Sequence, residues 1–90
     1  MNSSLQSLDQ LQRGQHGHIG ALVGNASFGP MDGLVTLRLQ ELGFLPGAKL
    51  EVIGHGFLGR DPVAVRLGST KFALRLAEAR KVMVQVATLA

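Results

Sequence analysis

The stretch that decides the fold reads Leu37-Arg38-Leu39-Gln40-Glu41-Leu42-Gly43-Phe44-Leu45-Pro46-Gly47. Leucines recur in and before it at helical spacing, which makes one broad side apolar and predicts a helix over residues 33–42. Gly43 follows the last periodic residue, where a left-handed helix end favours a residue without Cβ. Pro46-Gly47 then predicts a tight turn, because proline fixes the first central φ and glycine accepts a positive second one. A helix should therefore end abruptly here and lead straight into a strand.

Alternating apolar residues on both sides of this stretch predict the rest of the fold. Strands are expected over residues 16–24, 48–55, 63–67, 71–74 and 82–86. With glycine-rich turns between them, they favour a mainly β fold, a small antiparallel barrel of about five strands with one α-helix packed against it. We expect Leu37 and Leu42 of that helix to be buried against the barrel, and Asp32 to cap its N-terminus.

Length and composition limit the class of protein. Ninety residues make a single domain, which we place at residues 8–87 after a flexible N-terminus over residues 1–7. The chain has no cysteine, so disulfides and thiolate metal sites are excluded, and this suits a reducing compartment. No apolar run approaches the ~20 residues of a membrane helix, and the N-terminus lacks the features of a secretory signal. We therefore expect a cytoplasmic protein with no direct membrane insertion.

Two histidines are the candidate metal ligands. His16 and His18 are two residues apart on a predicted strand, so they share one face and can chelate a single ion through their imidazole nitrogens. The alternative is that both simply face solvent, since metal sites normally need three or four placed ligands. No cofactor is required by the sequence, and a divalent transition metal, iron or zinc, is the one cofactor that this pair leaves open.

Enzymatic and nucleic-acid functions find little support. The serines lie in polar or turn segments, and no close carboxylate pair occurs in an apolar run. The sequence therefore indicates that the protein is not an enzyme. The glycines around residues 54–59 lack the lysine and hydroxyl of a phosphate loop. The formal net charge of +3 comes from nine scattered basic residues, and with no Trp or Tyr the chain lacks the stacking residues of single-strand binders.

A protein-interaction surface is the remaining possibility. Apolar residues beside Gly or Pro turns are the hardest to bury, and an exposed group of them marks a partner site. Phe44 is expected to fill the barrel beneath the helix. The candidates for the partner interface, with arginines for rim charge, are Leu45, Phe57, Leu58, Arg38 and Arg60.

Two blocks of the sequence resemble the ferrous iron transport protein A (FeoA) family. The family pattern has an R-L-x-E-L-G-F-x-P-G block and an a-L-R-x-x-E-A-x-x-I-x-V ending, with Val82 here at the usual isoleucine. The matching residues are Arg38, Leu39, Glu41 to Phe44, Pro46, Gly47, Leu74, Arg75, Glu78, Ala79 and Val84. We assign a structural role to Leu37, Leu42, Gly43, Pro46, Gly47, Leu74 and Ala79.

The resemblance implies an SH3-like barrel that serves as a cytoplasmic accessory or regulatory protein for ferrous iron uptake. Its implied partner is the FeoB-type GTP-binding membrane permease, through which it would lie peripheral to the inner membrane. One alternative is a metal-sensing or metal-binding module that uses His16 and His18 and resembles the SH3-like C-terminal domain of iron-dependent repressors. A small-barrel nucleic-acid-binding protein is the other. Self-association into a homo-oligomer is left open.

Overall fold

The computed structural model describes residues 4–87 of the chain. Its strands and helices, in chain order, are β1 (Ser4–Ser7), the 3-10 helix η1 (Leu8–Gln10), β2 (His16–Leu22), the 3-10 helix η2 (Ala26–Met31), α1 (Asp32–Glu41), β3 (Lys49–Leu58), β4 (Asp61–Leu67), β5 (Thr70–Leu74), α2 (Leu76–Ala79) and β6 (Val82–Val86).

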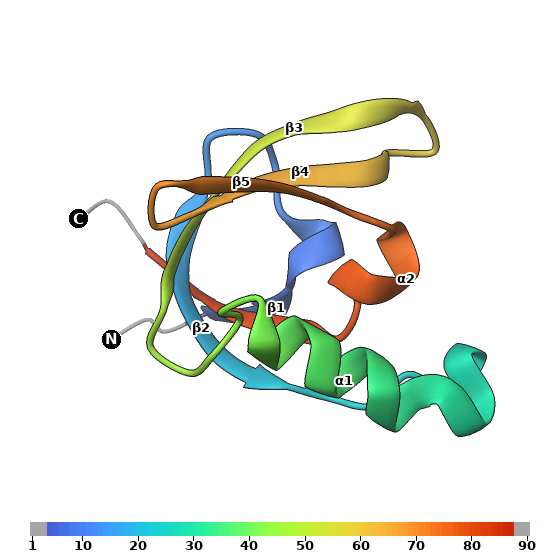
Figure 1. Ribbon diagram of the computed structural model, residues 1–90. Coiled ribbons are helices and arrows are strands. Elements are labelled where there is room, and N and C mark those ends of the chain that lie inside the picture. The colour runs from blue at the N-terminus through green and yellow to red at the C-terminus, as the bar shows by residue number, and fades with distance from the viewer. Residues whose placement is uncertain (1–3, 88–90) are drawn as a thin grey trace.

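All strands belong to one antiparallel sheet. Its order is β1-β6-β2-β3-β4-β5, and the sheet curls so that η1 and α2 lie inside the curve (Figure 1). Alternate residues of β3, β4 and β6 point inward, as their burial patterns show. The core is apolar and consists of Leu8, Leu11, Ile19, Leu39, Phe44, Leu50, Val52, Val63, Val65, Leu67, Leu74, Ala79, Val82, Val84 and Val86. The predicted mainly β architecture with one longer helix is confirmed.

The N-terminal residues differ from the sequence expectation and add a strand to the sheet. Six strands form the sheet, because residues 4–7 pair with β6 as the edge strand β1. The prediction of a flexible segment over residues 1–7 is therefore wrong for residues 4–7, and residues 1–3 lie outside the described part. These four residues are mostly polar and carry little apolar alternation, so the pairing with β6 decides their conformation rather than their own pattern.

The helix end and the turn after it follow the sequence prediction. Gly43 has a φ of 107° and donates its amide to Gln40 O at 3.0 Å, while the Phe44 amide reaches Leu39 O at 3.0 Å. These two bonds form the glycine-terminated helix end known as the Schellman motif. Gly47 has a φ of 89°, and the Ala48 amide closes the turn on Leu45 O at 3.0 Å. The Phe44 ring is thereby buried, with its centroid 5.3 Å from that of Phe72.

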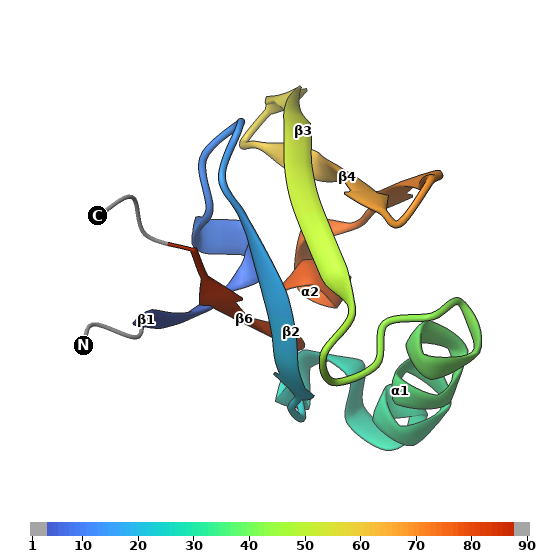
Figure 2. The same ribbon diagram turned by 90° about the vertical axis from the view of Figure 1, so that its left-hand side faces the viewer.

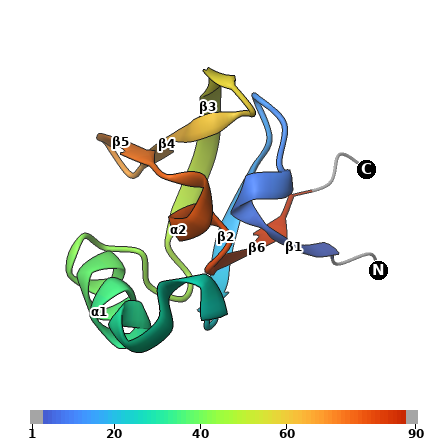
Figure 3. The ribbon, with the colours of Figure 1, turned by 90° about the vertical axis from the view of Figure 1, so that its right-hand side faces the viewer.

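Helix α1 buries less of its apolar surface than predicted. Leu37 is 48% exposed and Leu42 is 39% exposed, whereas Leu39 is only 2% exposed. The expectation that Leu37 and Leu42 are buried is therefore wrong. Figures 2 and 3 show the reason, because α1 stands beside the curled sheet instead of lying across its opening. Only a narrow strip of the helix, centred on Leu39, can then face the core.

The start of α1 is held by a buried lysine. We predicted Asp32 as the N-terminal cap, but Met31 occupies that position and Asp32 is the first residue of the helix. Its carboxylate accepts hydrogen bonds from the Asn25 amide at 2.9 Å and from Lys81 Nζ at 2.5 Å. Lys81 is fully buried, and its ammonium lies 5.9 Å from the centroid of the Phe28 ring. This ion pair joins the η2–α1 segment to the residue just before β6.

Candidate functional site

The tip of the β3–β4 hairpin presents the most exposed apolar side chains of the described residues. Phe57 is fully exposed and Leu58 is 84% exposed, and they are the last two residues of β3, whose first half buries Leu50 and Val52. The hairpin projects beyond the rest of the sheet (Figure 1). Adjacent apolar side chains at full exposure are costly to keep in water and mark a surface that binds something else.

Arg60 fixes this tip to the body of the protein. It has a φ of 67°, and its guanidinium Nη2 donates to Leu11 O at 2.8 Å and to Asp9 O at 3.3 Å. The same Nη2 lies 3.1 Å from His55 Nε2, which is itself 3.1 Å from Leu11 O. Arg60, which we expected to supply rim charge, instead has its guanidinium engaged inside the chain. Its role is to hold the hairpin in place.

Close backbone packing supports the same tip. The register between β3 and β4 shifts twice, between Val52 and Gly54 and between His55 and Leu58, which lets the strand continue through its glycines. A Cβ on Gly56 would clash with the carbonyl oxygen of Asp61. The tip is also joined to α2, because the carboxylate of Asp61, which pairs with Leu58, accepts a hydrogen bond from the Leu76 amide at 3.0 Å. The tip is therefore an ordered projection.

The other predicted interface residues lie elsewhere. Leu45 is half exposed in the turn after α1, and Arg38 is exposed on α1 itself. Arg38 borders a small pocket between α1 and β5 together with Leu42 and Phe72. Figure 2 shows α1 and the hairpin tip at opposite ends of the molecule. The structure therefore brings Phe57 and Leu58 together, and it does not bring Leu45 or Arg38 to them.

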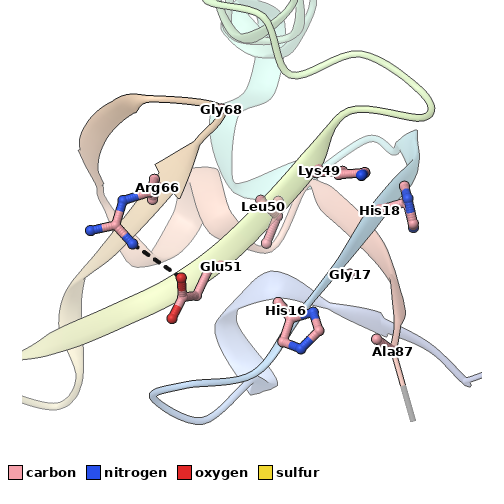
Figure 4. Close-up of a pocket in the computed structure, with 9 residues that line it drawn as sticks. All are labelled: His16, Gly17, His18, Lys49, Leu50, Glu51, Arg66, Gly68 and Ala87. Atoms are coloured by element: carbon pink, nitrogen blue, oxygen red, sulfur yellow. Dashed lines mark hydrogen bonds and ion pairs between the residues drawn. The ribbon is translucent and has the colours of Figure 1, made fainter. Parts of the chain in front are cut away.

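The predicted histidine pair lies in a shallow groove on the outer face of the sheet. The groove has a volume of about 510 Å³ and crosses β2, β3 and β4 (Figure 4). His16 and His18 are both exposed, and they stand opposite Glu51 and Lys49 of β3. Glu51 is already paired with Arg66, at 3.1 Å. Within residues 4–87 the two imidazoles have no hydrogen-bond partner, and no group of three or more potential metal ligands occurs there.

No helix within the described range is long and apolar enough to span a membrane. The comparison with curated proteins gives no match.

Comparison with solved structures defines the class of protein first. The chain is similar to a FeoA from Stenotrophomonas maltophilia, described as a procaryotic SH3 domain protein and complexed with zinc. The two share 30% identity over 89% of each chain, with a TM-score of 0.74. A FeoA protein from Chlorobium tepidum is 25% identical over 92% of this chain and 71% of that one, with a TM-score of 0.75. The fold is thus that of a small SH3-like domain.

A sequence model of the FeoA domain matches residues 6–86, nearly the whole chain. The chain therefore belongs to the FeoA family, which is implicated in ferrous iron transport. A manganese-dependent transcriptional repressor has the same fold over 44% of its length, with 14% identity and a TM-score of 0.77. At that identity the likeness extends to the fold alone.

Proposed function

We propose that this protein is a non-catalytic accessory of ferrous iron uptake that docks onto the GTP-binding region of a FeoB-type permease. It acts at the cytoplasmic side of the inner membrane and reaches that membrane through its partner. The hairpin tip is the docking element. Membership of the FeoA family supports a role in ferrous iron uptake, and the exposed Phe57–Leu58 pair supports docking onto a partner protein.

The tip has the properties of an interface anchor. Burying an exposed Phe or Leu side chain gives about 1.5–3 kcal/mol, and such anchors carry most of the free energy of an interface. The bonds from Arg60 to Leu11 O and Asp9 O hold the loop before any partner arrives. Because the loop is already ordered, less conformational entropy is lost on binding. A convex, ordered apolar tip requires a partner with a matching apolar pocket.

Docking can regulate the permease only through a difference in affinity. If the tip binds the GTP-bound and GDP-bound states unequally, it shifts the equilibrium between them by that difference and no more. Equal affinity for the two states would make the protein a passive ligand. The mechanism therefore predicts that affinity depends on the nucleotide.

The proposal is tested by calorimetric titration of the protein into the GTP-binding domain of a FeoB-type permease, loaded with GDP or with a GTP analogue. We expect binding in at least one state and a clear loss of affinity for the double variant Phe57→Ser/Leu58→Ser. Leu34→Ser is the matched control, because Leu34 is an exposed leucine on α1, away from the tip. Absence of binding in both nucleotide states would overturn the proposal.

A further inference from the structure

The groove on the outer face of the sheet contains half of a metal site. Side chains two apart on a strand point to the same side, so His16 and His18 project together from β2 (Figure 4). Between them lies Gly17, which is buried on the other face, where a Cβ would clash with the Gln85 carbonyl oxygen. Imidazole nitrogens suit zinc, copper, nickel and ferrous iron. The pair is therefore prepared to hold two coordination positions of one such ion.

Residues 4–87 of a single copy do not complete this site. Zinc in a closed protein site takes four ligands in a tetrahedron. Residues 4–87 hold no third potential ligand grouped with the two histidines. A closed site therefore takes two further ligands from outside residues 4–87, and a second copy supplies the same two imidazoles.

The charges around the histidines are arranged for such a pairing. On β3, Lys49 stands opposite His18 and Glu51 stands opposite His16. Consider a two-fold axis that lies between the two sheets, perpendicular to their strands and level with Gly17. Rotation about this axis reverses the strand direction between copies. It sets each His16 over the His18 of the other copy, and each Lys49 over the other Glu51. Sheets packed face to face lie about 10 Å apart, a gap that these long side chains can span.

We infer that a divalent transition metal bridges two copies of this chain through His16 and His18, with reciprocal Lys49–Glu51 ion pairs fixing the two-fold arrangement. The interface is isologous, so it closes at two copies and does not propagate. Along β3 the tip at Phe57 lies eight residues beyond Lys49, about 25 Å away at the rise of a strand. Metal pairing and docking therefore use separate surfaces, and the isolated chain tests the first without the second.

Light scattering coupled to size exclusion, with zinc chloride or with EDTA, measures the pairing directly. We expect a monomer in EDTA and a dimer with one zinc per two chains once zinc is added. His16→Ala and His18→Ala each remove the zinc-dependent dimer, while the control His55→Gln keeps it, because His55 lies toward the hairpin tip, contacts Leu11 O and does not line the groove. A monomer in excess zinc, one zinc per monomer, or a dimer that survives both alanine variants would overturn the inference.

Charge reversal tests the orientation. Lys49→Glu and Glu51→Lys each set like charges against each other twice in the dimer, so each raises the zinc concentration needed for pairing, by about tenfold. The double variant restores opposite charges and should pair at close to the original zinc concentration. Because Glu51→Lys also breaks the contact with Arg66, circular dichroism checks the fold of each variant. A double variant that pairs no better than the worse single one contradicts the two-fold arrangement.

Discussion

At the scale of single residues, the partly exposed carboxylate of Asp32 is shaped by the buried ammonium of Lys81. The hydrogen bond from Lys81 is the main reason why the pKa of the Asp32 carboxyl lies below its ordinary value, and the Asn25 amide lowers it further. A carboxyl with a lowered pKa adds stability that is fully present above its unfolded pKa of about 3.9 and is lost as the pH falls through its folded pKa. The ion pair should therefore stabilise the protein at neutral pH and fail in acid.

We predict that Asp32→Asn lowers the melting temperature at pH 7, because it leaves the fully buried Lys81 without its carboxylate partner. The gap between the variant and the natural protein should narrow steadily as the pH falls below about 4. Scanning calorimetry across pH 2.5–7 measures it, and adding Lys81→Met to the variant should recover part of the loss. A gap that is absent at pH 7 would contradict this assignment.

The leucines of α1 should differ strongly in their contribution to stability. Leu39→Ala removes a side chain that is almost wholly buried, and we expect it to lower the free energy of unfolding by about 2–5 kcal/mol. Leu37→Ala changes a side chain that is half exposed and should cost about 1 kcal/mol or less. Urea unfolding of both variants provides the comparison. Equal losses would mean that α1 packs on the sheet by a different face.

At the scale of elements, the β3–β4 hairpin depends on one glycine more than on its neighbour. Gly56→Ala places a methyl group against the carbonyl of Asp61, whereas Gly54→Ala meets nothing within 4 Å. Overpacking of this kind costs about 1–3 kcal/mol, so amides near the tip should exchange roughly ten- to a hundredfold faster in the first variant. Hydrogen exchange of residues 54–61 measures this, with Gly54→Ala as the control. Matching exchange rates in the two variants would show that the close approach is unimportant.

The elements differ in how far sequence alone predicts them. Alternation predicts β4 and β6 well, because each buries every second residue of an apolar run. It also finds β5, although that strand buries only Leu74 and part of Phe72. It ends β3 too early, since register shifts carry the strand through glycines that read as a turn. It misses β1, whose pairing with β6 is a long-range contact. Local pattern thus predicts strands with a buried face and fails where tertiary pairing decides.

At the scale of the whole molecule, the sequence predicts the apolar residues of the candidate site but not the contacts that hold them in place. Glycines beside Phe57 and Leu58 correctly suggested that the two side chains would be hard to bury. The role of Arg60 was not readable from sequence, because its acceptors at Asp9 and Leu11 are about fifty residues away in the chain. The exposure of Leu37 and Leu42 differs from the prediction for a similar reason. Periodicity identifies an apolar face, and only the position of the helix beside the sheet shows how much of it is covered.

The docking surface itself is open to direct measurement. An NMR titration of the isotope-labelled protein with the GTP-binding domain of a FeoB-type permease reports which amides sense the partner. We predict that the shifted resonances cluster in residues 54–61 at the hairpin tip, with the outer surface of α1 unaffected. Shifts confined to α1 or to the outer face of β2, with the tip unchanged, would contradict the account.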